Sequence, residues 1–284
     1  MPVHDFILTL ACPDRTGIVY NVSGLLLKHQ GNIIDAQQFG DGETGQFFLR
    51  VHFALPDGVG IEQVKTDFVI LAPQFQMSWQ LHDAQKKARL LVLVSKQGHC
   101  LNDLLYRVHS KQVNADIVGI VSNHQDFAQM AKSYEIPFHY LPVTPETKAS
   151  QEAAILAIVK REEIDLVVLA RYMQILSPEL CSALRGKAIN IHHSFLPSFK
   201  GARPYYQAHA RGVKIIGATA HYVTHDLDEG PIIEQDVQRV DHTMNAQDLT
   251  QVGSDIESRV LSRAVSSHVE HRILVNGSKT VVFR

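Results

Sequence analysis

The first eighty residues alternate short apolar strands with amphipathic helices. Residues 6–10 form an apolar run of strand length, and Ile18, Val22 and Leu26 recur at the spacing of one helical face. Thr16, just before this segment, is the expected N-cap. Two strands joined by a glycine-rich turn, a second helix and a last strand follow: residues 33–39, 46–53, 61–71 and 74–81. This order predicts a ferredoxin-like βαββαβ domain over residues 1–83.

A polar stretch without periodic apolar positions, residues 83–87, marks the linker to a second domain, residues 84–284. Apolar strands then alternate with helices: strands 90–94, 116–121, 137–141, 166–169 and 188–192, and helices 101–108, 127–134 and 148–162. The alternation predicts a Rossmann-like α/β domain with a mainly parallel sheet, whose ligands bind at the C-terminal ends of the strands. A helix over 246–271 and a hairpin turning at Asn276-Gly277 close the chain.

Composition narrows the possible functions. Of 284 residues, 45% are hydrophobic and 20% charged, and a net charge of −2 gives no reason to expect a nucleic-acid partner. We find no apolar run of membrane-spanning length, no secretory signal, and no GxGxxG, Walker A or GxSxG motif. The cysteines (Cys12, Cys100 and Cys181) lack CxxC spacing, which is typical of reduced thiols in the cytoplasm.

The strand over residues 188–192 carries the first candidate chemistry. Alternation places Asn190 and His192 on the same face, about 7 Å apart, with His193 expected on the opposite face. An amide that can donate to a developing oxyanion, beside an imidazole that titrates near neutrality, suits chemistry at a carbonyl. The alternative is a strand end whose polar residues only cap the sheet.

A second polar loop, residues 223–231, follows the apolar strand 217–223. It holds two acids separated by one residue, Asp226 and Asp228, followed by Glu229-Gly230-Pro231, which indicates a tight turn with one carboxylate facing inward. Such a carboxylate can orient a histidine or take a proton from water. A solvated turn is the alternative. We expect this loop to lie at the same strand ends as Asn190 and His192.

Sixteen histidines raise the question of a metal. His268 and His271 are three residues apart, which is not the HExxH spacing. His192 and His193 with His221 or His225 could gather a zinc ion, but adjacent strand histidines point apart. We therefore expect no metal.

Three blocks together resemble a known family, in that family's order and spacing. They are residues 169–178 (Leu-Ala-Arg-Tyr-Met-Gln-Ile-Leu-Ser-Pro), 190–197 (Asn-Ile-His-His-Ser-Phe-Leu-Pro) and 227–231 (Leu-Asp-Glu-Gly-Pro). From about Arg89 to the C-terminus the chain resembles the formyltransferase fold that uses 10-formyltetrahydrofolate. Within that family it looks like the formyltetrahydrofolate deformylases, because amine-directed members usually have proline where His193 stands.

The resemblance implies hydrolysis of 10-formyltetrahydrofolate to formate and tetrahydrofolate, which supplies formate for purine synthesis and balances one-carbon folate pools, with no cofactor. It implies that Asn190 donates to the oxyanion, that His192 is an oxyanion partner or proton carrier, and that Asp228 orients His192 and positions or deprotonates the water. The division of proton transfers between the last two stays open. The residues implied in holding the pterin are Met173, Ile175, Leu176, Val223, Thr224 and His225. His193 and the loop from Ser198 to Tyr206 would close the side where an amine enters.

The first domain resembles an ACT domain, a regulatory module that often binds amino acids, through residues 13–17 (Pro-Asp-Arg-Thr-Gly) and 31–33 (Gly-Asn-Ile). That likeness implies an amino-acid effector near Asp14, Gly17 and Asn32, and a homodimer or homotetramer. A purely structural oligomerisation module is the alternative for this domain. For the whole chain, the alternatives are formyl transfer to glycinamide ribonucleotide, or an inactive amino-acid sensor that still binds folate.

Overall fold

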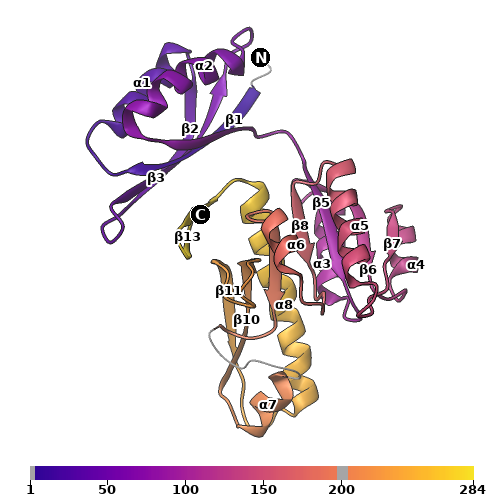
Figure 1. The fold of residues 1–284 in the computed structure, drawn as a ribbon. Helices are drawn as coiled ribbons and strands as arrows, with labels where there is room; N and C mark the ends of the chain where they lie inside the picture. Colours follow the sequence, from indigo (N-terminus) through magenta and orange to yellow (C-terminus); the bar gives the residue numbers. More distant parts are fainter. Residues whose placement is uncertain (1–3, 197–203) are drawn as a thin grey trace. The chain divides into compact units, whose positions relative to one another are not determined.

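The computed structural model describes residues 4–196 and 204–284, and the chain divides into two compact units (Figure 1). The first unit combines the chain up to Lys87 with Glu270–Arg284, and the second spans Ala88–Val269. This division differs from the one expected from the sequence at the C-terminus. Residues 270–284, expected in the second domain, belong to the first unit.

The first unit contains an antiparallel sheet in the strand order β2-β3-β1-β4, built from elements in the predicted βαββαβ sequence. The elements are β1 His4–Pro13, α1 Ile18–Lys28, β2 Asn32–Asp41, β3 Gln46–Leu55, α2 Ile61–Leu71 and β4 Ser78–Asp83. Apolar residues of the helices and of β1 and β3 form its core, with Phe53 and Phe68 among the fully buried side chains.

Two local predictions for this unit were wrong. Thr16 does not cap α1, because the N-cap position is taken by Gly17 at a φ of 93°, a left-handed conformation that glycine adopts without strain. The last strand begins at Ser78 instead of Gln74, because Ala72–Phe75 forms a 3-10 helix that contains a proline in its first turn.

The C-terminal hairpin, β12 Ile273–Asn276 and β13 Lys279–Val282, is held to the first unit by side-chain contacts. Arg50 donates to the carbonyl oxygen of Glu270 at 3.1 Å, and Asn276 donates to the carboxylate of Asp41 at 2.7 Å. The rings of His82 and His271 stack with centroids 3.5 Å apart. The periodicity of the sequence cannot predict contacts of this kind, because they join positions far apart in the chain.

The second unit has a seven-stranded sheet in the order β11-β10-β9-β8-β5-β6-β7 (Figure 1). Its strands are β5 Ala88–Val94, β6 Ala115–Ser122, β7 Phe138–Tyr140, β8 Leu166–Leu169, β9 Ala188–His192, β10 Ile215–Tyr222 and β11 Ile232–Arg239. Its helices are α3 His99–His109, α4 Ala128–Ser133, α5 Lys148–Arg161, α6 Pro178–Ala183, α7 Pro204–Ala210 and α8 Ala246–Val269. Strands β5 to β9 pair in parallel, which confirms the predicted mainly parallel α/β sheet.

Helices cover both faces of this sheet. Leu91 and Leu93 of β5 pack with Ile155 and Ile158 of α5 in one apolar cluster. The long helix α8 packs against α3, β9, β10 and β11. Burial on both faces explains why β5 is a continuous apolar run without alternation.

The last two strands of the sheet run antiparallel, and this corrects one expectation. Thr219 of β10 pairs with His192 of β9, and Tyr222 pairs with Ile189, so β10 ends where β9 begins. The loop after β10 therefore starts at the opposite end of β9 from His192. It reaches the candidate site only because it folds back.

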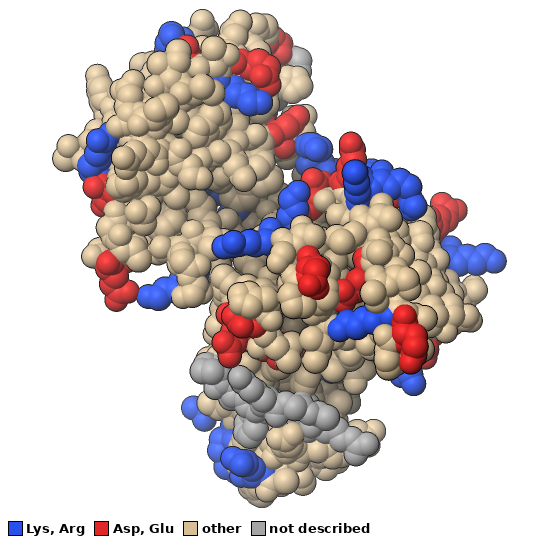
Figure 2. Space-filling model, in the orientation of Figure 1, with Lys and Arg blue, Asp and Glu red and all other residues tan. Residues whose placement is uncertain are grey.

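The described surface has no large single-sign patch on the face that Figure 2 shows, where basic and acidic side chains are interspersed on each unit. None of the described helices combines the length and apolarity that a bilayer crossing requires. The three cysteines are all free and buried.

Candidate active site

Antiparallel pairing of β9 and β10 places four polar side chains on one face of the sheet. Asn190 lies directly opposite His221, and His192 lies opposite Thr219. Directly paired residues point the same way, and residues two apart share a face. The sequence analysis foresaw the Asn190–His192 pair, but it weighed His221 only as a zinc ligand and missed it as a partner of Asn190.

The loop after β10 returns to this face and brings in Asp228. Gly230 makes the return possible, since a Cβ at this position would lie 1.7 Å from the carbonyl oxygen of Tyr222. Asp228 has a φ of 58°, a left-handed conformation that costs a non-glycine residue energy and is common at functional sites. Its Oδ1 lies 3.2 Å from Nδ1 of His192 and 3.7 Å from Nε2 of His221.

The two imidazoles set the charge of this carboxyl group. Burial alone raises the pKa of Asp228, but the hydrogen bonds and positive potential of His192 and His221 outweigh burial and hold that pKa far below its ordinary value of 3.8. Asp228 is therefore ionised throughout the neutral range, and it acts as a fixed negative charge and hydrogen-bond acceptor.

Hydrogen bonds also fix the orientation of Asn190. Nδ1 of His221 lies 3.0 Å from the carbonyl oxygen of Tyr222, which can only accept, so this nitrogen carries the hydrogen. Nε2 of the same ring lies 3.3 Å from Nδ2 of Asn190. The side-chain amide of Asn190 is therefore held beside His221 of the neighbouring strand.

His192 has an unused nitrogen. Its side chain is buried, and Nε2 has no hydrogen-bond partner among the described residues. A buried polar atom without a partner costs free energy, and at functional sites a ligand commonly supplies the partner. Nδ1 of His192 faces Asp228, and Nε2 lies on the other side of the ring. The carboxylate at Nδ1 therefore influences whether Nε2 donates or accepts a hydrogen bond.

His193 does not lie opposite to His192, as extended geometry had predicted. Strand β9 ends at His192, and the two rings stack with centroids 5.0 Å apart at an angle of 22°. The following residues are held by Thr219, which donates to the carbonyl oxygen of Ser194 at 3.0 Å and accepts from the amide of Leu196 at 3.1 Å. The expected amine-side loop lies largely outside the described residues, from Ser198 through residue 203.

The residues expected to hold a flat ligand fall into two groups. Met173 and Ile175 are exposed although they are apolar, whereas Leu176 and Val223 pack against the core. Residues 224–226 form a turn in which Thr224 donates to the carbonyl oxygen of Asp226 and His225 pairs with its carboxylate at 3.1 Å. Asp226 is thus engaged at the surface, and the inward-facing acid of this loop is Asp228.

A cavity of about 350 Å³ adjoins the cluster of Asn190, His192, His221 and Asp228 through His193, whose ring stacks on His192. It touches His193 and Met173, whereas none of those four residues lines it. The other described residues that line it are Ser95, Lys96, Gln97, Asn123, His124, Arg171, Gln174, Tyr205, Tyr206, Thr250, Ser254 and Glu257.

One group of possible metal ligands adjoins this cavity: His99, Cys100 and Glu257. Glu257 already accepts from His99 at 2.7 Å and from Tyr205 at 2.6 Å, and the guanidinium of Arg171 lies 3.3 Å away. Burial raises the pKa of Cys100 well above its ordinary value, which keeps the thiol protonated. A divalent cation does not fit a site that already contains a buried arginine.

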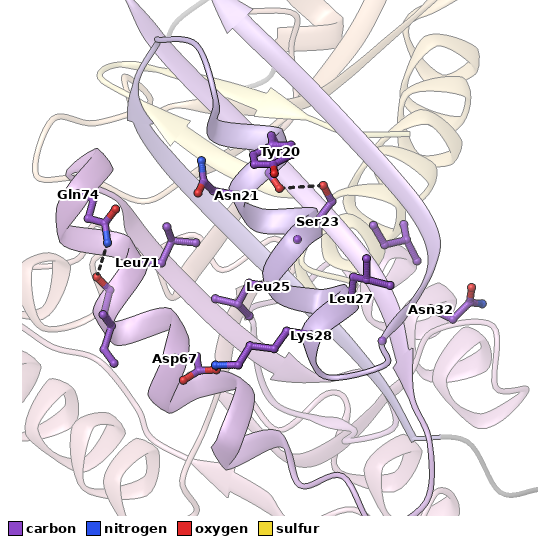
Figure 3. A pocket seen from close by; sticks show the side chains of 14 residues that line it. Tyr20, Asn21, Ser23, Leu25, Leu27, Lys28, Asn32, Asp67, Leu71 and Gln74 are labelled. Atoms are coloured by element: carbon purple, nitrogen blue, oxygen red, sulfur yellow. Dashed lines mark hydrogen bonds and ion pairs between the residues drawn. The ribbon is translucent and has the colours of Figure 1, made fainter.

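The residues expected to bind an effector are not brought together within one chain. Gly17 precedes α1 and Asn32 follows it, so the length of the helix, about 16 Å, separates them. Asn32 lines an open groove over α1 and α2, in which Lys28 reaches Asp67 at 2.6 Å (Figure 3). Neither Asp14 nor Gly17 lines this groove.

Comparisons with known proteins identify relatives of this arrangement. The sequence profile of the formyl transferase family matches residues 88–265. A formyltetrahydrofolate deformylase of Corynebacterium sp. (strain P-1) is 50% identical and covers 98% of both chains. The crystal structure of formyltetrahydrofolate deformylase from Burkholderia mallei has a TM-score of 0.95 at 50% identity and covers 99% of this chain and 100% of its own.

A more distant relative shares only part of the chain. The glycinamide ribonucleotide transformylase 1 of Symbiobacterium toebii has a TM-score of 0.66 at 27% identity, and the match covers 70% of this chain and 95% of that one.

The depressed pKa of Asp228 predicts a pH-dependent stability. A carboxyl group whose pKa is lowered in the folded state stabilises the fold above its unfolded pKa, and this contribution is lost as the pH falls below that value. Asp228→Asn should therefore lower the free energy of unfolding at pH 7, and the difference from the unsubstituted chain should shrink below pH 3.8. Urea titrations at several pH values measure this, with Asp226→Asn, an exposed acid of the same loop, as control. An Asp228→Asn effect of equal size at pH 7 and pH 3 would contradict the assignment.

Proposed function

The chain belongs to the formyl transferase family and, within it, to the formyltetrahydrofolate deformylases, and from this premise we propose that it hydrolyses 10-formyltetrahydrofolate at the cluster of Asn190, His192 and Asp228. It is a hydrolase acting on a formyl C–N bond, and its products are formate and tetrahydrofolate. The observation that supports the site assignment is that Asp228 lies 3.2 Å from His192 and 3.7 Å from His221, and that His221 in turn contacts the amide of Asn190.

The reaction adds water to the formyl carbon. A C–O bond forms as the attacking water gives up a proton, and negative charge develops on the formyl oxygen. The carbonyl then re-forms while the C–N bond breaks and the folate nitrogen takes up a proton. The amide of Asn190 and the unpartnered Nε2 of His192 receive the developing oxyanion. In comparable sites, loss of one such donor costs about 3–4 kcal/mol of transition-state stabilisation.

Asp228 serves as the orienting charge in this scheme, and His192 carries the proton. A carboxyl group whose pKa is far below its ordinary value holds a proton poorly at neutral pH. The carboxylate lies 3.2 Å from Nδ1 of His192 and orients the ring, with Nε2 directed away from Asp228. His221 keeps Asn190 in register from the neighbouring strand, so we assign it a positioning role.

The folate substrate lies across the exposed apolar side chains of Met173 and Ile175, with Leu176 and the turn of Val223, Thr224 and His225 on the other side. Flat ligands are commonly covered by apolar side chains and held at their edges by backbone groups. The exposure of the large apolar side chains of Met173 and Ile175 supports this placement. The reaction needs no metal or further cofactor, because the folate derivative is itself the substrate.

The runner-up function, formyl transfer to glycinamide ribonucleotide, has less support. The only sequence candidate for a phosphate site was the loop of residues 96–99. Two of its side chains already have protein partners, since Gln97 accepts from Arg171 at 2.6 Å and His99 pairs with Glu257 at 2.7 Å. An inactive amino-acid sensor is disfavoured by the intact set of Asn190, His192 and Asp228.

In this proposal the first unit acts as an ACT-type regulatory domain. The protein as a whole is located in the cytoplasm. The βαββαβ order and the buried free thiols support these two assignments. Pairing of chains into a homodimer or homotetramer is supported by large apolar side chains exposed on the first unit, among them Tyr20, Leu27 and Ile70. An effector near Asp14, Gly17 and Asn32 then requires a second chain, because α1 separates these residues within one.

The direct test of the function is formate release from 10-formyltetrahydrofolate without an added amine. We expect stoichiometric formate and tetrahydrofolate, and a rate that changes when glycine or methionine is added. Formate that appears only in the presence of an amine acceptor would rule out hydrolysis.

The site assignment predicts large losses in turnover. His192→Ala and Asp228→Asn should each lower kcat by about 10²–10⁴ while the folate KM changes only a few-fold, because His192 acts on the reacting atoms and Asp228 orients His192. Steady-state kinetics measure this, with His225→Ala as a control at the exposed turn. Near-normal kcat in either variant removes its residue from the mechanism.

His193 is predicted to influence the choice between water and an amine. Replacement by proline removes the ring that stacks on His192 and should raise formyl transfer to glycinamide relative to hydrolysis. Both products are quantified in the same reaction. An unchanged ratio, in a variant that still hydrolyses the substrate, would exclude this role.

A further inference from the structure

Three neighbouring strands carry a row of polar side chains that includes His192. Thr219 of β10 lies directly opposite His192 of β9 on one side and Gln235 of β11 on the other. Directly opposed residues point to the same face of a sheet, so the three side chains lie side by side. Thr219, in the middle of the row, is completely buried. The reaction scheme above gives no role to Thr219 or Gln235.

The hydroxyl group of Thr219 uses all of its hydrogen-bonding capacity. A hydroxyl can donate one hydrogen bond and accept two. Oγ1 of Thr219 accepts from the backbone amide of Leu196 at 3.1 Å and from Nε2 of Gln235 at 2.9 Å. Because both of these groups are N–H donors, the hydroxyl hydrogen is directed to the carbonyl oxygen of Ser194, at 3.0 Å. The hydroxyl therefore has a single orientation.

Gln235 holds the same segment of the chain. Its Nε2 also donates to the carbonyl oxygen of Leu196 at 3.1 Å, so both backbone polar groups of Leu196 are bonded to side chains. Ser194 and Leu196 are buried and lie outside the strands. Buried backbone groups need partners of this kind, because an unpaired one costs free energy. Thr219 and Gln235 therefore fix the path of residues 194–196.

This segment follows the reacting imidazole closely. Strand β9 ends at His192, and only His193 separates that residue from Ser194. The ring of His193 stacks on the ring of His192 with centroids 5.0 Å apart. The ladder between β9 and β10 holds the chain before His193, and the Thr219 hydroxyl holds it afterwards. The place of the His193 ring, and the packing that it gives to His192, thus depend on Thr219.

We propose that Thr219, supported by Gln235, is a positioning residue for the reaction, because it holds the chain that leaves His192 and so keeps the His192 imidazole in place for the substrate. The inference rests on the proposed hydrolysis at His192. Thr219 acts in this scheme through the backbone of residues 194–196 and makes no contact with the reacting atoms. A misplacement of about 1 Å can lower a rate about 10²-fold, so the loss of this hold should reduce kcat.

Two substitutions at position 219 test the proposal. Thr219→Val keeps the shape of the side chain but removes the hydroxyl, so the amide of Leu196 and the carbonyl oxygen of Ser194 lose a partner. It should lower kcat about tenfold or more while the folate KM stays within about threefold, since the folate surface is formed by other residues. Thr219→Ser keeps the hydroxyl and should retain kcat within about threefold of the unsubstituted chain. Steady-state formate release measures both variants.

Ser262→Ala is the matched control. It removes another buried hydroxyl of the second unit, which donates to the carbonyl oxygen of Arg259 at 3.1 Å. Urea unfolding is measured for each variant beside its kinetics, and Ser262→Ala should keep the kcat of the unsubstituted chain. A purely structural hydroxyl at position 219 would lower stability and leave kcat normal in the folded variant. A folded Thr219→Val variant with unchanged kcat would therefore overturn the proposal, and so would a Thr219→Ser variant as slow as Thr219→Val.

Gln235→Leu provides an independent measurement if Thr219→Val does not fold, because Gln235 is only partly buried. It removes the bonds to Thr219 and to the carbonyl oxygen of Leu196, and it should lower kcat about threefold to tenfold with the folate KM within about twofold. An unchanged kcat in folded Gln235→Leu would then overturn the proposal. Absence of formate release from the unsubstituted chain would instead refute the hydrolysis on which it rests.

Discussion

The contact on which the proposed active site depends is that of the Asp228 carboxylate with two imidazoles, those of His192 and His221. The carboxylate lies 3.2 Å from His192 and 3.7 Å from His221, and these partners keep it ionised although it is partly buried. A buried charge is tolerated only when its partners compensate for the lost hydration. Removing Asp228 or either imidazole therefore leaves the remaining groups without a hydrogen-bond or charge partner. Asn190 depends on the same contact indirectly, because His221 holds its amide.

The sheet supplies this contact by reversing direction at one edge. Strand β10 runs antiparallel to β9, and in this pairing His221 of β10 lies directly opposite Asn190 of β9. Directly opposed residues point to the same face, so the two side chains are adjacent. Because of the same reversal, the loop after β10 begins near the N-terminal end of β9, away from His192. The close approach at Gly230 and the left-handed conformation of Asp228 bring that loop back. Local strain at Asp228 is thus the consequence of building a three-residue site from an antiparallel edge.

Periodicity and motif spacing predicted most elements correctly and identified Asn190 and His192 as candidates, whereas the family resemblance selected Asp228 from the two acids of the later loop. Contacts between distant positions escaped them. The partnership of His221 with Asn190 follows from strand register, which no local pattern encodes, and the stacking of His193 follows from the end of β9. The placement of the C-terminal hairpin in the first unit depends on contacts such as that of Arg50 with the carbonyl oxygen of Glu270, across more than two hundred residues.

The central claim is that Asn190, His192 and Asp228 surround a single formyl carbon. A crystal structure with a non-hydrolysable 10-formyl folate analogue tests it most directly. We predict that the formyl oxygen lies within about 3.2 Å of both Nδ2 of Asn190 and Nε2 of His192, with Asp228 still bonded to Nδ1 of His192. A formyl group bound beyond hydrogen-bonding distance of all three side chains would contradict the account.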